Sequence, residues 1–154
     1  MIPKVLSLRP IGVVRNEVTN QKQRGWASIA SDLVLDECYA EALDGIEDFS
    51  HAVVIFWLDR AKAIDSLKDH VQGRKELPVV GVFARRAPIR PNPLAVTAVP
   101  IISREGHILR VKGLDAIDGT PLLDIKPYTP AFDKMDAARV PEWSRLVYEA
   151  EDYF

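Results

Sequence analysis

The sequence predicts a small all-β domain, a barrel or a sandwich, flanked by short helices. About six short runs of apolar and β-branched residues alternate with turn signals, which is typical of such folds. Hydrophobic residues make up 47% and charged residues 27% of the 154 positions, an ordinary composition for one globular domain. This composition excludes a disordered chain, and 8 glycines and 11 prolines are too few for a collagen-like or low-complexity chain.

The expected strands differ in how deeply they are buried. Residues 52–58 form a continuous β-branched and aromatic run, which indicates a strand buried on both faces. Another strand covers residues 94–102, and Pro100 is expected to weaken its end, because proline cannot donate to a sheet ladder. The other expected strands span residues 11–14, 28–35, 79–83, 108–114 and 122–125.

Three segments are expected to be helical. Residues 38–43 precede the turn signal Asp44-Gly45, and residues 61–72 place three apolar side chains at helical spacing. The clearest is a C-terminal helix at about 141–153, because Pro141 suits a first helical turn. Its apolar face holds Trp143, Leu146, Val147, Ala150 and Phe154. We expect this face to dock on the barrel, with a contact between two copies of the chain as the alternative.

Charge and cysteine content limit the setting in which the chain works. The formal net charge is -2, from 20 Lys and Arg against 22 Asp and Glu, which argues against a protein that coats DNA. The single cysteine, Cys38, cannot form an internal disulfide and favours a reducing compartment. The longest apolar run is too short for a membrane span, and Arg9-Pro10 interrupts any signal-peptide core, so we expect a cytoplasmic protein. The histidines have no zinc-like spacing with Cys38, so no metal is expected.

The most unusual stretch joins a buried strand to three arginines, Arg85, Arg86 and Arg90, within a proline-rich segment. Proline fixes its own φ and holds the preceding residue extended, so Arg90, which precedes Pro91, has a rigid backbone. A rigid loop loses little entropy when it binds a ligand, and arginine offers a planar fork of donors to carboxylate or phosphate. We interpret the segment as an anion site, with solvated arginines on a structural turn as the alternative.

A second cluster follows the strand expected at 108–114. Asp118-Gly119-Thr120-Pro121 is a turn signature, and Asp118 and Asp124 flank the next apolar run. Backbone groups of this turn can meet a small ligand beside a carboxylate. Alternatively, Asp118 only forms the turn, and Asp124 pairs with Lys126 or an arginine. His51, at a strand start, is expected to be structural, and the chain lacks the motifs of common hydrolases and dinucleotide-binding folds.

Three motifs together resemble the TsaA-like family, also known as YaeB or TrmO. They are residues 43–51 (LDGIEDFSH), residues 81–94 with Arg86 and the run RPNPL, and residues 118–128 (DGTPLLDIKPY), in family order. The resemblance implies a small antiparallel β-barrel, a homodimer and S-adenosylmethionine as methyl donor. It also implies N6-methylation of threonylcarbamoyladenosine at position 37 of tRNA, beside the anticodon.

The resemblance extends to individual positions. Ser50, His51, Arg86, Val96 and the turn Asp118-Gly119-Thr120-Pro121 match cofactor-contact positions of the family, as do Gln23 and Arg24. Arg86 or Arg90 suits the carboxylate of the donor, which charge-assisted hydrogen bonds would hold. The methylated nitrogen must lose a proton, and Asp118 or Asp124 is the expected catalytic acceptor.

The chain departs from the family pattern in two places. It reads Ala87-Pro88 after the arginines and Ala95-Val96-Thr97 after the proline motif, both small changes in side-chain size. It ends at Phe154, so we expect a single domain over residues 1–154, without the C-terminal domain that helps longer members hold tRNA. Phosphates would then contact Lys22, Arg24, Arg74 and Lys75. Two alternatives keep the cofactor: methylation of a small molecule or other acceptor, and a non-enzymatic S-adenosylmethionine-binding module.

Overall fold

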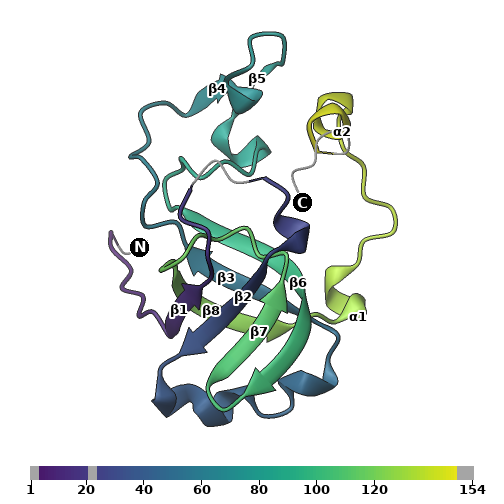
Figure 1. The fold of residues 1–154 in the computed structure, drawn as a ribbon. Helices are drawn as coiled ribbons and strands as arrows, with labels where there is room; N and C mark the ends of the chain where they lie inside the picture. Colours follow the sequence, from purple (N-terminus) through teal and green to yellow (C-terminus); the bar gives the residue numbers. More distant parts are fainter. Residues whose placement is uncertain (1–3, 21–23, 149–154) are drawn as a thin grey trace.

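The structure is a computed structural model and describes residues 4–20 and 24–148. Its centre is a closed antiparallel barrel with the strand order β1-β2-β7-β6-β3-β8 (Figure 1). The strands are β1 (Gly12–Arg15), β2 (Ala30–Leu35), β3 (His51–Trp57), β6 (Leu94–Glu105), β7 (Ile108–Lys112) and β8 (Pro121–Pro127). The closed sheet confirms the predicted antiparallel β-barrel and excludes the sandwich.

The remaining elements are short. Strands β4 (Lys68–His70) and β5 (Val79–Gly81) pair into a separate sheet outside the barrel. The helices with 3-10 geometry are η1 (Trp26–Ser28), η2 (Glu37–Leu43), η3 (Ile46–Asp48), η4 (Val71–Gly73) and η5 (Val82–Ala84). The α-helices are α1 (Pro130–Asp133) and α2 (Glu142–Tyr148). No helix in the described part of the chain is long and apolar enough to cross a membrane.

The barrel core is built from alternate positions of the strands. In β3, Val54 and Phe56 are fully buried, and Val53 and Ile55, which alternate with them, face outward, because successive side chains of a strand point to opposite faces. Val53 and Ile55 are only half-buried, so the prediction of a strand buried on both faces is wrong. Other strands supply the rest of the core, with Val14, Leu33, Val99, Leu109, Val111 and Leu122.

Strand β6 runs through Pro100 instead of weakening there, and it ends at Glu105. Up to Pro100 it pairs with β3, and from Ile101 it pairs with β7, with a register shift between Ile101 and Ser103. Pro100 therefore lies where the strand changes partners, a position at which a missing N–H disturbs the sheet little. The sequence does not reveal this exchange, so the expected weakening is corrected.

Residues 61–72 do not form the predicted helix. The Ser66 hydroxyl donates to the Lys68 carbonyl at 2.6 Å and accepts from the Lys68 N–H at 3.3 Å. Such local side-chain bonds compete with helical ones, and β4 then pairs with β5. Of the apolar side chains in this segment, Leu67 is exposed and Val71 is buried, so the helical spacing did not reflect a single buried face.

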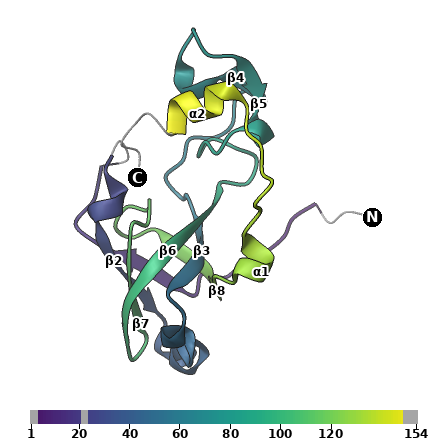
Figure 2. The same cartoon turned by 90° about the vertical axis from the view of Figure 1, so that its right-hand side faces the viewer.

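Helix α2 packs on the β4–β5 sheet, which corrects the expectation that it docks on the barrel. Val147 is fully buried against Val71 and Leu77, and Trp143 covers this cluster. Figure 2 shows α2 beside β4 and β5, away from the barrel strands. Leu146 is exposed, so it does not share the buried face. Ala150, Phe154 and the expected helix end at residue 153 lie outside the described residues.

One end of the barrel is closed by η2 and η3, and we call it the closed end. Leu43 and Ile46 from these helices reach into the barrel core and are almost fully buried. Gly45 joins the helices with a φ of 85°, a conformation that side chains with a Cβ rarely adopt. The predicted turn at Asp44-Gly45 is confirmed, and it brings the buried side chains of Leu43 and Ile46 to the same end of the core.

Polar contacts hold the closed end in place. The Arg104 guanidinium, from β6, donates to the Ala40 carbonyl at 3.0 Å and to the Asp44 carboxylate at 2.8 Å. Asp36 caps η2 by accepting the Cys38 N–H at 3.1 Å, and this hydrogen bond lowers the pKa of Asp36. These contacts tie η2 to β6 and fix the start of η2.

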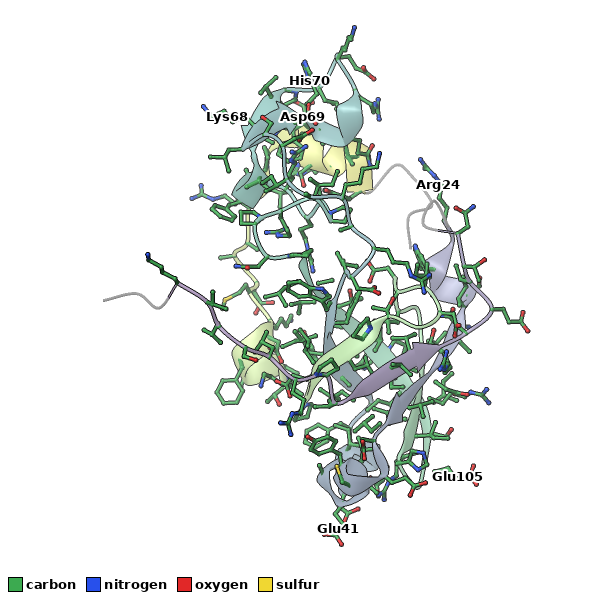
Figure 3. All side chains as sticks on the ribbon, turned by 90° about the vertical axis from the view of Figure 1, so that its left-hand side faces the viewer. Arg24, Glu41, Lys68, Asp69, His70 and Glu105 are labelled. Carbon is green, nitrogen blue, oxygen red and sulfur yellow. The ribbon has the colours of Figure 1, made fainter. Side chains whose placement is uncertain are left out.

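The closed end is strongly acidic. Residues 36–48 carry no Lys or Arg, and their acidic members are Asp36, Glu37, Glu41, Asp44, Glu47 and Asp48. Figure 3 shows Glu41 and Glu105 together at this end, far from Lys68, Asp69 and His70 of the β4–β5 sheet. Anions are therefore repelled from this part of the surface.

Candidate functional site

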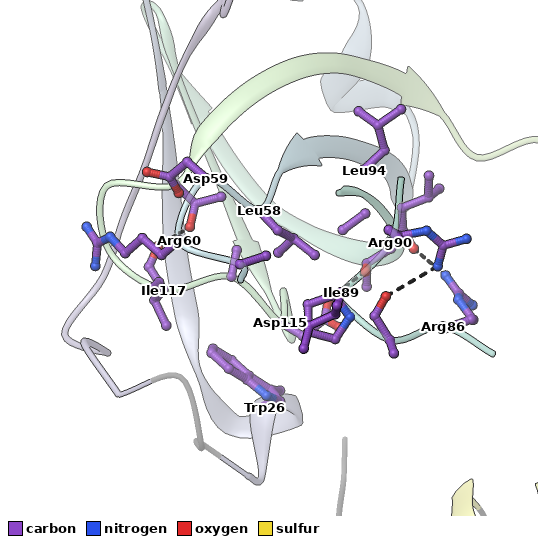
Figure 4. A pocket seen from close by; sticks show the side chains of 18 of the residues that line it. Trp26, Leu58, Asp59, Arg60, Arg86, Ile89, Arg90, Leu94, Asp115 and Ile117 are labelled. Carbon is purple, nitrogen blue, oxygen red and sulfur yellow. Dashed lines mark hydrogen bonds between the residues drawn. The ribbon is translucent and has the colours of Figure 1, made fainter. Parts of the chain in front are cut away.

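The other end of the barrel opens into a cavity of about 1140 Å³, and we call it the open end. Segments far apart in sequence line it: η1, the residues after β3, the proline-arginine segment, the first half of β6 and residues 115–120. In the view of Figure 4, Arg86, Arg90 and Asp115 lie at one side, and Asp59, Arg60 and Ile117 lie at the other. Helix α2 contributes Tyr148.

The three arginines of the proline-rich segment have different partners. Arg86 donates to the Val96 carbonyl of β6 through a short hydrogen bond. Arg90 donates to the carbonyls of Arg85 and Ala87 at 3.3 and 3.4 Å, so it braces its own loop. These partners are neutral carbonyls, so they position Arg86 and Arg90 without pairing either guanidinium with a carboxylate. Both arginines line the cavity as rigidly mounted cations.

Arg85 points away from the cavity. Its side chain is 10% exposed, lies 3.7 Å from the Asp69 carboxylate and donates to the His70 carbonyl at 3.3 Å. Arg85 thus ties the proline-arginine segment to β4. This contact fixes one wall of the cavity to the β4–β5 sheet.

The turn at Asp118-Gly119 anchors the opposite wall. Gly119 has a φ of 81° and donates its N–H to the Val14 carbonyl at 2.8 Å. The Asp118 carboxylate faces outward, where it accepts from the Asn16 N–H at 3.2 Å and lies 3.4 Å from Arg15. The buried Thr120 lines the cavity.

Arg60 reaches the same turn from the segment after β3. Its guanidinium donates to the Asp118 carbonyl at 3.2 Å, and a Cβ on Gly119 would lie 3.2 Å from the same nitrogen. Glycine therefore leaves room for Arg60. Arg60 and Thr120 therefore line the cavity at this turn, whereas Asp118 does not, and the Thr120 hydroxyl donates to the Ile117 carbonyl at 2.8 Å.

The cavity brings several of the sequence-predicted site residues together and leaves the others outside. Arg24, Arg86, Arg90, Val96 and Thr120 line it. Those that do not line it are Ser50, His51, Asp118, Gly119, Pro121 and Asp124. Gln23 lies outside the described residues.

The predicted residues outside the cavity have partners of their own. His51 begins β3, whereas the cavity surrounds the end of that strand; its Nδ1 lies 2.8 Å from the Ser50 hydroxyl, and its ring packs against Tyr128. The Asp124 carboxylate lies 2.6 Å from the Lys126 ammonium. This ion pair is the alternative that the sequence left open for Asp124.

Sequence reasoning missed three of the polar and aromatic residues of the cavity: Arg60, Asp115 and Trp26. The Thr97 hydroxyl donates to the Asp115 carboxylate at 2.5 Å, which joins β6 to the loop after β7. Of these three residues, Asp115 lies nearest to a predicted feature, three residues before the turn at Asp118. Arg60 is 58 residues from Asp118, and no local pattern links them.

The lining of the cavity is positively charged. Its described residues include five cations, Arg24, Arg60, Lys62, Arg86 and Arg90, and two carboxylates, Asp59 and Asp115, an excess of three positive charges. Trp26, Leu58, Ile89 and Ile117 add apolar surface. A cavity of this kind suits a ligand that has both an anionic group and a flat apolar part. Across the described part of the chain, no three His, Cys, Asp or Glu side chains gather to hold a metal.

The fold and the site define a family. The chain belongs to the tRNA-methyltransferase O N-terminal domain family, whose model matches residues 15–134. This match runs from the last residue of β1 to the end of α1 and includes the other five barrel strands. It also covers both walls of the cavity.

Known relatives and structures support this assignment. A probable S-adenosyl-L-methionine-binding protein of Pyrococcus abyssi is 38% identical over 98% of this chain and 83% of its own length. A mouse tRNA (adenine(37)-N6)-methyltransferase is 36% identical over 60% of this chain and 21% of its own. The crystal structure of TrmO from Pseudomonas aeruginosa superposes with a TM-score of 0.73 and 30% identity, over 92% of this chain. This chain spans 63% of that TrmO chain.

Proposed function

We propose that this chain is an S-adenosylmethionine-dependent methyltransferase that methylates N6 of threonylcarbamoyladenosine at position 37 of tRNA. One observation carries the proposal: the open-end cavity joins the proline-arginine segment to the Thr120 turn, two of the three segments that carry the resemblance to the family. The family membership and the names of the relatives agree with it.

The residues of the cavity fit S-adenosylmethionine. Its carboxylate matches Arg86 and Arg90, whose hydrogen bonds go to backbone carbonyls and not to carboxylates. Its adenine suits the apolar surface of Trp26 and Ile117. When bound, this cofactor supplies an activated methyl group. The chain contributes rigidly held side chains, which align the methyl donor with the acceptor.

The proton on the acceptor nitrogen must leave as the methyl group is transferred. The predicted acceptors are Asp118 and Asp124, and this role stays a prediction. Both carboxylates already contact other groups, Asp118 with Arg15 and Asp124 with Lys126. Either residue would have to give up an ion pair in order to take the proton.

The distribution of charge favours RNA at the open end. The chain carries a net charge of -2, yet the lining of the cavity has a positive excess and residues 36–48 are acidic. Phosphate contacts supply most of the affinity for nucleic acid. We therefore expect the anticodon region to approach the open end, with Arg24, Arg74 and Lys75 near its phosphates. Lys22 lies outside the described residues.

A homodimer forms part of the proposal. Between Leu94 and Ile102, the exposed positions of β6 are all apolar: Leu94, Val96, Ala98, Pro100 and Ile102. A continuous apolar strip of this kind on a sheet is typical of a protein contact. Leu94 and Val96 also line the cavity, so a second copy that packs on this face would contribute to the wall of the cavity. We also propose a cytoplasmic location, which suits the exposed thiol of Cys38.

Transfer of a labelled methyl group tests the proposal. The protein is mixed with labelled S-adenosylmethionine and tRNA from a strain that lacks the N6-methyl modification, and the nucleosides are separated after digestion. We expect label in the threonylcarbamoyladenosine fraction. Label in another nucleoside or a metabolite would favour the second candidate, a methyltransferase with another acceptor. Cofactor binding without transfer would favour a binding module, which the name of the Pyrococcus relative suits.

A further inference from the structure

We propose that Asp115, held by Thr97, faces the positively charged sulfur of the methyl donor and makes the cavity select the donor over its neutral sulfide product. The inference rests on the proposed binding of S-adenosylmethionine but not on the identity of the methyl acceptor. It assigns a role to a carboxylate that sequence reasoning did not single out.

Asp115 differs from the other carboxylates around the site. Among the described residues that line the cavity, Asp115 is half-buried and Asp59 is exposed at the rim. Asp118 and Asp124 do not line it, and each lies beside a cation, Arg15 or Lys126. Asp115 is thus the carboxylate that is both shielded from solvent and directed to the ligand space.

The backbone around Asp115 fixes its direction. Leu114 and Ala116, its two neighbours, are almost fully buried. Asp115 itself is only half-buried and lines the cavity, so its side chain does not join those of its neighbours in the core. The preceding Gly113 adopts a φ of 84° and donates its N–H to the Ile29 carbonyl at 2.8 Å, which ties the segment to the barrel.

Thr97 then orients the carboxylate itself. Its hydroxyl donates to Oδ1 of Asp115 at 2.5 Å. No other hydrogen bond or ion pair to Asp115 is present among the described residues, so Oδ2 keeps its capacity for a ligand. The hydrogen bond from Thr97 therefore holds the Asp115 carboxylate in place on the wall of the cavity.

The charge of the ligand explains why such a group is needed. Arg86 and Arg90 suit the negative end of the donor, but they repel its positive sulfur. A carboxylate on the same wall offsets this repulsion. After the methyl group has left, the sulfur is a neutral sulfide and the attraction to Asp115 disappears. The same side chain thus favours binding of the donor and release of the product.

Titration calorimetry with both forms of the cofactor tests the inference. An opposite charge within about 4–6 Å changes an equilibrium by about 10- to 1000-fold. In Asp115→Asn we expect affinity for S-adenosylmethionine to fall at least about tenfold by this rule, while affinity for S-adenosylhomocysteine stays nearly the same. In Thr97→Val, which keeps the carboxylate but frees it, we expect the same change to a smaller extent. Glu105→Gln, at the closed end, serves as the matched control and leaves both affinities unchanged.

Three outcomes overturn the inference. Equal losses for both ligands in Asp115→Asn would place Asp115 at a part of the cofactor that both forms share. No loss for either would remove Asp115 from the site, and in both cases the proposed cofactor site itself would stand. No binding of either ligand by the unmodified protein would instead overturn the proposed function together with this inference.

A measurement on the unmodified protein covers the case in which the variants misfold. The preference for the charged ligand should weaken as salt is raised, because salt screens the attraction between Asp115 and the sulfur. A preference for the charged ligand that does not change with salt would contradict the inference.

Discussion

The two ends of the barrel are built from the same strands and hold their charged groups in opposite ways. At the closed end, Arg104 contacts the carboxylates of Asp44 and Glu47, so its charge is neutralised locally. At the open end, Arg86 and Arg90 donate to backbone carbonyls, which position a guanidinium without neutralising it. A carbonyl-held arginine is therefore both ordered and available to an anion. The partners of an arginine, more than its presence, distinguish a binding end from a structural one.

The same comparison explains why net charge is a poor guide to the partner of this protein. An acidic closed end and a basic cavity add to a total of -2. A ligand or an RNA at the open end responds mainly to the charges near it. Salt largely screens its interaction with charges more than about 8–10 Å away. The predictions below change one end at a time.

The largest effect is expected at the closed end. Leu43→Ala truncates a side chain that is 3% exposed, and truncations of this kind cost about 2–5 kcal/mol of unfolding free energy. Urea unfolding measures the loss. The nearby exposed Glu41→Gln is the control and leaves stability within about 0.5 kcal/mol. Affinity for S-adenosylmethionine at 20 °C or below should persist while the variant is folded. A variant of normal stability that cannot bind the cofactor would show that the two ends are not independent.

The next effect is expected at the open end. Arg86→Ala removes a cation that would hold the donor carboxylate, and charge-assisted bonds of about 1.5–3 kcal/mol correspond to an affinity loss of about 10- to 150-fold. Calorimetry measures this for donor and product alike, since both carry the carboxylate. Arg104→Ala, at the closed end, should reduce stability and leave the affinity unchanged. An Arg86 variant that binds normally would remove the proline-arginine segment from the site.

A change on the outer face of β6 tests the proposed dimer. Ile102→Glu puts a charge on the apolar strip, and burying an unpaired charge is costly enough to raise the dimer dissociation constant by at least about tenfold. Light scattering during size-exclusion chromatography measures the mass at several concentrations. Lys112→Glu, on the exposed side of β7, is the control and keeps the unmodified mass. A monomeric unmodified protein would contradict this part of the proposal.

The smallest effect concerns RNA. Lys62→Ala removes one exposed cation from the cavity rim, so affinity for tRNA should fall modestly and the slope of log affinity against log salt by about 1. Filter binding over a range of salt measures both. Lys112→Ala, away from the cavity, leaves the slope unchanged. An equal effect of both variants would mean that RNA does not distinguish the open end.

Local patterns in the sequence predicted the barrel strands and pointed to some of the residues that line the cavity. Alternating and continuous apolar runs identified the strands, and the proline-arginine and Asp118-Gly119 segments both reach the cavity, through Arg86, Arg90 and Thr120. These features are local, so a single sequence contains them. The resemblance to a family added the closed barrel, which strand patterns alone do not distinguish from a sandwich.

Several of the errors involve contacts between distant residues. Pro100 remains in β6 because the strand changes partners there, and α2 docks on Val71 and Leu77 of an inserted segment. Arg60 and Asp115 escaped notice because their partners, Asp118 and Thr97, lie 58 and 18 residues away. Periodicity reports which face of an element is apolar, but it does not report what covers that face.

Mapping of the bound cofactor by NMR tests the central claim, that the open end and not the closed end holds S-adenosylmethionine. Amide signals of the unmodified protein are followed while S-adenosylmethionine is added. The account predicts saturable shifts in residues 86–98 and 115–120, with residues 36–48 unchanged. Shifts confined to residues 36–48, or no saturable shift at the open end, would contradict it.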